Sequence, residues 1–162
     1  MKKSAILVAV GALFAGSAYA QSSVTLYGIV DTTIHYTTNA NANGNSLLQM
    51  DNGAVSNSRW GLKGSEDLGG GNKALFVLES GFGVNDGRLQ QGGRLFGRQA
   101  YVGLEGGFGS LTFGRQENLV FNTAGQYDAL SIGNLGATAW HVTATGVRID
   151  NSVKYVADFN GW

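Results

Sequence analysis

Residues 24 to 37 read Val24-Thr-Leu-Tyr-Gly-Ile-Val-Asp-Thr-Thr-Ile-His-Tyr-Thr37. Apolar and polar side chains alternate along this stretch, with Leu26 and Ile34 on one face and Thr25 and Asp31 on the other. A period of two indicates a β-strand, because successive side chains of a strand point to opposite faces. The run is longer than an ordinary globular strand. We predict one long, half-apolar strand over residues 24–37.

The segment before this strand has the three parts of a secretory signal peptide. Met1-Lys2-Lys3 is a positively charged head, Ala5 to Ala15 is an apolar run, and Ala18-Tyr19-Ala20 is a small-x-small cleavage site. The apolar run is too short to span a bilayer. We therefore expect residues 1–20 to be a removable export signal and the mature chain to comprise residues 21–162.

The composition narrows the classes of protein that this chain can belong to. The 162 residues include 26 Gly but no Cys, so the exported chain does not rely on disulfide bonds. Without Lys2 and Lys3, the mature part has 9 basic and 11 acidic residues, a formal charge of 9 − 11 = −2. This balance does not favour nucleic acid as a partner. No apolar run beyond residue 20 approaches about 18 residues, so a membrane role would require strands closed into a barrel.

Alternating segments recur along the chain between clusters of glycine and asparagine. After the first strand, the pattern predicts five further strands, over residues 56–64, 73–82, 94–105, 110–116 and 143–156. The connections alternate in length: residues 65–72 and 106–109 are short turns, whereas residues 39–46 and 83–93 are longer loops. In the first turn, Asp67 and Gly69-Gly70-Gly71 are expected to supply positive-φ positions. Short turns at one end and longer loops at the other are typical of transmembrane β-barrels.

Residues 117–139 interrupt the pattern, because they have no clean period. The stretch contains Val120, Phe121, Tyr127 and Leu130, too many large apolar groups for a solvated linker. We predict a functional loop packed against another part of the protein. The count of about six strands is below the roughly eight that a single-chain barrel needs, which favours a fragment over a truncated gene or a barrel made from several copies.

Five sequence blocks occur in order along the mature chain. They are Thr25-Leu-Tyr-Gly-Ile-Val-Asp31, Ser58-Arg-Trp-Gly-Leu-Lys-Gly-Ser-Glu-Asp-Leu-Gly69, Gly97-Arg-Gln-Ala-Tyr-Val-Gly-Leu104, Ser110-Leu-Thr-Phe-Gly-Arg-Gln116 and Arg148-Ile-Asp-Asn-Ser-Val-Lys-Tyr155. Together they resemble the N-terminal part of the general Gram-negative trimeric porins, in particular the β-proteobacterial (Burkholderia- and Neisseria-like) branch. The resemblance implies an all-β fold, an antiparallel transmembrane barrel of about sixteen strands. It also implies that the third outer loop folds into the lumen, and residues 117–139 occupy its place.

The resemblance further implies an outer-membrane general-diffusion porin that passes small hydrophilic solutes and ions. Such a pore needs a charged constriction and neither a nucleophile nor a cofactor. The implied partners are two further copies in a homotrimer and the surrounding outer-membrane lipid, with no nucleic acid. Outward-facing apolar side chains should meet this lipid or a neighbouring subunit: Leu26, Val30, Ile34, Trp60, Leu111 and Phe113.

The constriction residues follow from the same resemblance. Basic residues on the second, fourth and sixth strands should face the lumen, and in this chain they are Arg59, Arg98 and Arg148. Arginine suits this role because it stays charged at any accessible pH. Opposing acids should come from the third strand and the inward loop, and they are Glu79, Asp128 and Glu117. Arg115, just before the loop, is expected to make a subunit contact.

Two other classes of function compete with the pore. Catalysis is disfavoured because the only histidines, His35 and His141, lie outside any nucleophile motif, and no Lys-Ser/Thr follows the Gly69-Gly70-Gly71 run. Two histidines without cysteine also supply no cluster of metal ligands. The remaining alternative is a non-transporting exported β-protein, either a small surface barrel or a sugar-binding sandwich. In such a sandwich, the apolar strand faces would form a core.

Overall fold

The computed structural model describes residues 23–53, 55–128 and 146–158, so the predicted signal peptide lies outside the described residues. Strands dominate this part of the chain, and one helix joins them. The strands are β1 (Ser23–Ile29), β2 (Thr32–Thr37), β3 (Leu47–Asn52), β4 (Arg59–Gly69), β5 (Asn72–Gly81), β6 (Gln99–Gly106), β7 (Gly109–Glu117) and β8 (Arg148–Val156), and the helix is α2 (Leu119–Tyr127).

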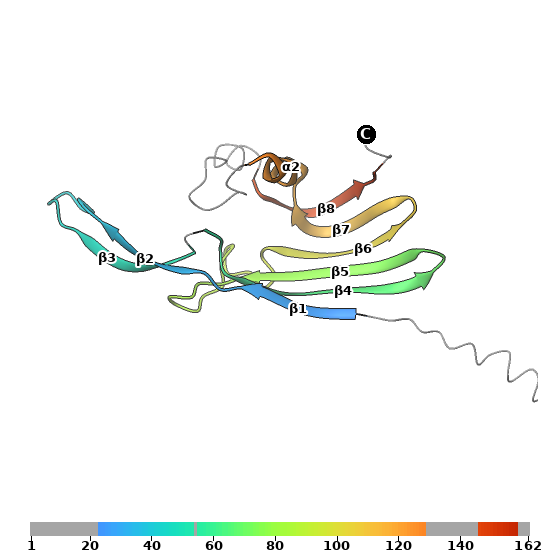
Figure 1. The fold of residues 1–162 in the computed structure, drawn as a ribbon, viewed down its shortest axis with the longest axis horizontal. Coiled ribbons are helices and arrows are strands. Elements are labelled where there is room, and N and C mark those ends of the chain that lie inside the picture. Colours follow the sequence, from blue (N-terminus) through green and yellow to red (C-terminus); the bar gives the residue numbers. More distant parts are fainter. Residues whose placement is uncertain (1–22, 54, 129–145, 159–162) are drawn as a thin grey trace, which may run out of the picture.

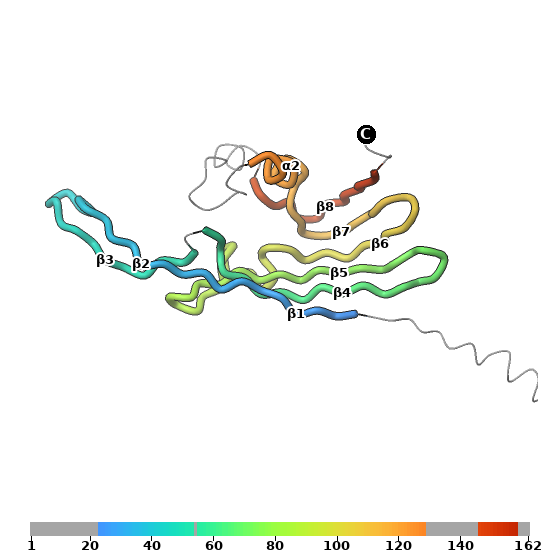
Figure 2. The backbone as a smooth tube through the Cα atoms, viewed as in Figure 1, coloured from blue at the N-terminus to red at the C-terminus, as the bar shows by residue number. Residues whose placement is uncertain are grey.

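Six strands form one antiparallel sheet in the order β1-β4-β5-β6-β7-β8, and β2 and β3 form a separate hairpin. The sheet is curved, and the hairpin extends away from it beyond β1 (Figures 1 and 2). Within the described residues, β1 and β8 are the two edges and do not pair with each other. The sheet is therefore open here, which fits part of a barrel wall.

The distribution of buried residues is the reverse of that in a water-soluble domain. Among the described residues no hydrophobic side chain is buried, and the buried polar or charged residues are Ser58, Glu79, Ser80, Arg98, Thr112, Gln116 and Asn118. In a soluble sandwich the apolar faces would instead be covered. An apolar outer face and a polar inner face are typical of a membrane barrel.

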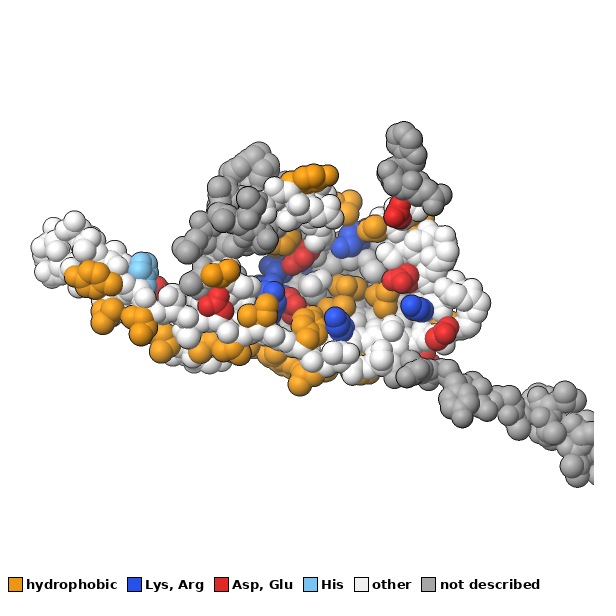
Figure 3. Space-filling view, viewed as in Figure 1, with side chains coloured by type: hydrophobic (Ala, Val, Ile, Leu, Met, Phe, Trp, Pro, Cys, Tyr) orange, Lys and Arg blue, Asp and Glu red, His pale blue; other side chains and the backbone are white. Residues whose placement is uncertain are grey.

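The strand registers show which side chains share the outer face. Phe76 pairs with Val102, which pairs with Phe113, so these three lie in one apolar row. Leu26, which is 69% exposed, pairs with Leu62 in a second row of the same face. Figure 3 shows apolar side chains along the lower edge of the molecule, whereas charged side chains gather over the middle of the visible face. The predicted outward residues Trp60 and Leu111 alternate in phase with these rows, and Val30 and Ile34 are also exposed.

The predicted single strand over residues 24–37 is wrong, because the chain breaks at Val30 and Asp31. The Asp31 backbone N–H donates to Ser58 Oγ (2.9 Å), and the Asp31 carboxylate accepts the N–H of Ser56 (2.8 Å). These bonds tie Asp31 to the segment before β4, while its carbonyl oxygen accepts the Gly53 N–H at 3.0 Å beside the β2–β3 hairpin. β1 pairs with β4, and β2 pairs with β3. The sequence pattern did not predict β3.

The first short turn is tighter than predicted. β4 continues to Gly69, and Asp67 pairs with Lys73 inside the ladder instead of occupying a positive-φ position. Gly69, Gly70 and Gly71 do have positive φ, which glycine adopts without steric cost. The predicted strand over residues 94–105 also starts later, because β6 begins at Gln99.

The predicted aperiodic loop over residues 117–139 begins with a helix. Asn118 caps α2, since its side-chain oxygen accepts the Phe121 N–H at 2.6 Å. The helix lies beside the ends of β7 and β8 (Figure 1). Residues 129–139 of this stretch lie outside the described residues. No helix in the described part is long and apolar enough to cross a membrane.

Candidate functional site

One row of the inner face brings together three strands. Tyr27 of β1 pairs with Gly61 of β4, which pairs with Glu79 of β5. A side chain on Gly61 would lie 2.8 Å from Cζ of Tyr27 and 2.9 Å from its hydroxyl oxygen. Because Gly61 has no side chain, the Tyr27 ring crosses β4 and its hydroxyl donates to Glu79 Oε2 at 3.0 Å. The glycine therefore permits a contact between β1 and β5.

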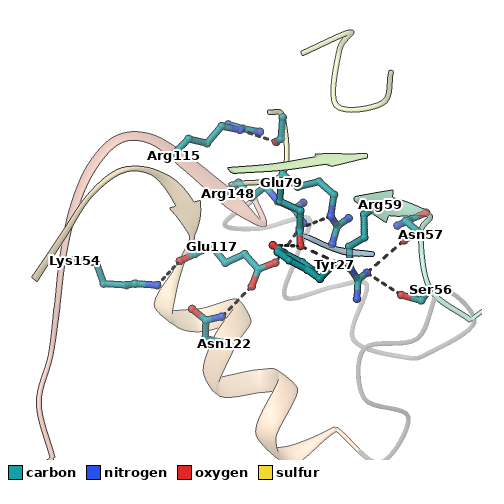
Figure 4. Close-up of polar contacts among 12 residues, drawn as sticks. Tyr27, Ser56, Asn57, Arg59, Glu79, Arg115, Glu117, Asn122, Arg148 and Lys154 are labelled. Carbon is teal, nitrogen blue, oxygen red and sulfur yellow. Dashed lines mark hydrogen bonds and ion pairs between the residues drawn. The ribbon is translucent and has the colours of Figure 1, made fainter. Parts of the chain in front are cut away.

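Glu79 is the centre of the first charged group, and it is only 4% exposed. Arg98 Nε donates to Glu79 Oε1 at 2.6 Å, and Arg98 itself is 8% exposed. Arg59 Nε lies 3.8 Å from Glu79 Oε2. The Glu79 carboxylate thus meets Tyr27 and Arg59, which Figure 4 labels, and also Arg98, and these contacts stabilise the charge of a buried acid.

Arg59 is oriented by residues that come just before its own strand, β4. Its Nη1 donates to Ser56 Oγ at 2.9 Å and to the Asn57 carbonyl oxygen at 3.3 Å. Arg98 lies just before β6, and a side chain on Gly81 would come within 3.2 Å of Arg98 Cδ. A second glycine therefore leaves space on this face for the side chains of Gln91 and Arg98, of which Gln91 Oε1 is the nearer to that position.

A second ion pair joins the last strand to the start of the loop. Arg148 Nη2 donates to Glu117 Oε1 at 3.3 Å, and Asn122 of α2 donates to Glu117 Oε2 at 3.1 Å. Lys154 Nζ donates to the Glu117 carbonyl oxygen at 3.3 Å. Glu117 thus links β7, β8 and α2. Figure 4 shows Arg148 beside Glu79, and we call the two ion pairs together the inner cluster.

The inner cluster contains five of the residues expected at a constriction: Arg59, Arg98, Arg148, Glu79 and Glu117. Three cations and two carboxylates leave a formal charge of +1. Asp128 is the half-buried residue at the C-terminal end of α2, and its expected place in the constriction stays a prediction. Sequence reasoning did not identify the roles of Tyr27, Asn122 and Lys154. The alternation of the first strand did place Tyr27 on its polar face.

Arg115 belongs to a different group. Its Nε donates to the Gly97 carbonyl oxygen at 2.7 Å, and its Nη1 donates to Asp150 Oδ1 at 2.5 Å. Figure 4 shows Arg115 apart from the inner cluster. The predicted subunit contact of Arg115 stays a prediction.

An antiparallel sheet with an apolar outer face and a charged inner face is typical of the wall of a membrane β-barrel. Comparison with known proteins gives the family: residues 5–162 match the Gram-negative porin family. An outer membrane porin protein of Bordetella pertussis is 44% identical over 96% of this chain and 44% of its own length. Outer membrane porin protein 32 of Delftia acidovorans is 39% identical, over 100% of this chain and 48% of its own length.

Major outer membrane protein P.IB of Neisseria gonorrhoeae is 30% identical over 96% of this chain and 44% of its own length. Among solved structures, the anion-selective porin from Comamonas acidovorans superposes with a TM-score of 0.71 at 35% identity, covering 86% of this chain and 44% of that chain. The chain belongs to the Gram-negative porin family. It spans about half the length of the curated relatives that it matches.

Proposed function

We propose that this chain forms part of an outer-membrane general-diffusion porin, which passes small hydrophilic solutes and ions. The supporting observation is the inner cluster, in which three arginines and two carboxylates lie on the polar face of a sheet with an apolar opposite face. Charged groups that face each other across a narrow pore decide which solutes pass. The proposed function is passive diffusion through a channel, which needs neither a catalytic residue nor a cofactor.

We further propose that residues 1–20 direct export, that additional strands close the barrel and that three barrels associate. The relatives are named outer membrane porins and are about twice as long as this chain. Sheet edges must be paired inside a bilayer, since an unpaired backbone group has no water to bond. α2 and the residues after it are proposed to narrow the lumen.

The excess of one positive charge in the inner cluster favours anions. The Arg98–Glu79 pair is buried and largely self-compensated, so the more exposed Arg59 should contribute most to the field in the lumen. The Comamonas acidovorans relative is named an anion-selective porin, which is consistent with this preference.

The test measures reversal potential across a planar bilayer in a salt gradient. Replacing Arg59 and Arg148 together by glutamine should lower the anion preference, because two cations leave the lumen while both carboxylates stay. The control is Arg88→Gln, which removes one cation from a side chain that is 86% exposed outside the cluster, and it should leave the reversal potential unchanged. An unchanged reversal potential in the double variant would show that neither arginine lines the pore. An absence of conductance in the unmodified protein would refute the proposal that it is a channel.

A further inference from the structure

The three arginines of the inner cluster differ in how closely a carboxylate neutralises them. Arg98 Nε lies 2.6 Å from Glu79 Oε1, and Arg148 Nη2 lies 3.3 Å from Glu117 Oε1. The ion pair of Arg59 is longer, because its Nε lies 3.8 Å from Glu79 Oε2. The Arg59 side chain is also the most exposed of the three, at 23% against 9% for Arg98 and 11% for Arg148. Arg59 is therefore the least neutralised cation of the inner cluster.

Neutral oxygens hold the Arg59 guanidinium on the side away from Glu79. Its Nη1 donates to Ser56 Oγ at 2.9 Å and to the Asn57 carbonyl oxygen at 3.3 Å. Figure 4 shows Ser56 and Asn57 on one side of this guanidinium and Glu79 on the other. A hydroxyl or carbonyl oxygen satisfies a guanidinium donor without adding a negative charge. The two bonds thus fix the side chain and leave its charge available to the lumen.

Tyr27 acts on the same ion pair from the Glu79 side. Its hydroxyl donates to Glu79 Oε2 at 3.0 Å, and this is the oxygen that Arg59 faces. The other oxygen, Oε1, accepts the bond from Arg98. A close pair between Arg59 and Glu79 would have to compete with Tyr27 for Oε2. The hydroxyl of Tyr27 therefore weakens the attraction of the carboxylate for Arg59.

Asp31 fixes the segment that carries Ser56. Its carboxylate accepts the N–H of Val55 at 3.0 Å and the N–H of Ser56 at 2.8 Å. The fully buried Ser58 hydroxyl accepts the Asp31 N–H and donates to the Asp31 carbonyl oxygen, each at 2.9 Å. These four bonds brace the segment against the break between β1 and β2. Because the backbone of Ser56 is held, its hydroxyl is placed to meet Arg59.

We propose that Ser56 and Tyr27 are positioning residues, which set the anion preference of the pore by keeping Arg59 from closing on Glu79. If either hydroxyl is lost, the guanidinium can move toward the carboxylate and form a close, charge-assisted pair, as Arg98 does. Opposite charges in contact cancel most of each other's field at a passing ion. The loss of one hydroxyl therefore removes the effect of a cation without removing the cation. The inference rests on the proposed channel function.

The test measures the reversal potential of the purified full-length protein in a planar bilayer under a salt gradient. Ser56→Ala should lower the ratio of anion to cation permeability by about twofold, because Arg59 becomes paired. Tyr27→Phe keeps the ring but frees Glu79 Oε2, so it should lower the ratio too, and it serves if Ser56→Ala fails to fold. Ser56→Thr restores a hydroxyl and should retain the unmodified ratio. Ser65→Ala, the same substitution at an exposed serine of β4, should also leave the ratio unchanged.

A double-mutant cycle separates the positioning of Arg59 from a general effect on the pore. In the Arg59→Gln protein, Ser56→Ala should not change the permeability ratio further, since the side chain that Ser56 positions is already neutral. An equal loss with and without Arg59 would overturn the proposal. So would an unchanged or raised ratio in a folded Ser56→Ala or Tyr27→Phe variant. Conductance of the unmodified protein is recorded first: its absence would refute the proposed function and this inference with it, whereas conductance with unaltered selectivity in the variants would reject the inference alone.

Discussion

At the scale of single residues, Glu79 is the centre of the inner cluster, because side chains from three segments of the chain contact its carboxylate. Tyr27, Arg59 and Arg98 all approach this one group. A buried ion pair contributes little net stability relative to an apolar pair, yet removing one partner is costly because the other charge remains buried. Glu79 therefore determines both the stability of the cluster and its charge.

Glu79→Gln should lower the free energy of unfolding by about 3 kcal/mol, since Arg98 would stay buried without its anion. The measurement is the urea dependence of refolding and unfolding in detergent micelles. Glu105→Gln is the matched control, because Glu105 is an exposed acid on β6. Equal stability of the two variants would contradict the dependence of the cluster on Glu79.

Gly61→Ala should also destabilise the cluster, by about 1 to 3 kcal/mol, because the added methyl group overpacks the site. Its Cβ would lie 2.7 Å from the backbone oxygen of Leu78, which has little freedom to move, and would displace the Tyr27 ring. Gly107→Ala is the control, since nothing lies within 4 Å of the methyl group there. The same unfolding assay compares the two, and a larger effect at Gly107 would contradict the packing around Tyr27.

At the scale of elements, α2 is held at its first turn and through Glu117. Asn118 accepts the Phe121 N–H through its side chain, and its backbone N–H donates to the Val147 carbonyl oxygen at 3.0 Å. Asn122 of the helix bonds to Glu117, which pairs with Arg148. The orientation of the helix is therefore coupled to an arginine of the inner cluster.

Asn118→Ala should weaken α2 by about 1 kcal/mol through loss of the N-cap. If α2 narrows the lumen, the open-channel current of single pores should then fluctuate more. Asn118→Asp retains the oxygen that accepts the Phe121 N–H but loses the amide that donates to the Gly146 carbonyl oxygen, so its increase in current noise reports that second bond. Identical current noise in the alanine variant and the unmodified pore would show that the N-cap of α2 does not affect the conducting path.

On the scale of the whole molecule, the reversed burial pattern decides between a membrane barrel and a soluble sandwich. β4 has 11 residues and β5 has 10, long enough to cross the hydrocarbon region, which requires about 9 to 11 residues in a tilted strand. The exposed apolar rows need lipid or another subunit to cover them. A closed barrel has no unpaired edges, and such barrels resist detergent until they are heated.

The outer-membrane form of the protein should therefore migrate as a compact, high-mass species in dodecyl sulfate gels when unheated, and as a single unfolded chain after boiling. A sugar-binding sandwich should migrate identically in both conditions, because dodecyl sulfate unfolds it without heating. A mobility independent of heating would contradict the barrel assembly, whatever the result of the conductance measurements.

The local sequence pattern determined where most strands lie, because a side-chain period of two can be recognised without knowing the partner strand. The alternating strands, the Gly69-Gly70-Gly71 turn and the inner-face phase of Tyr27 could all be predicted on that basis. The helix α2 could not, because its apolar residues have no clean period and its cap, Asn118, is a single residue.

Only the tertiary structure decided which charges meet. Tyr27 and Glu79 are 52 positions apart, and Arg115 and Asp150 are 35 apart, so their contacts depend on strand order and register. The break at Asp31 likewise depends on Ser58, which lies 27 positions away. A bulge in β8 then orients Asp150 in a way that strict alternation does not predict. These features arise from long-range pairing, which local residue patterns do not specify.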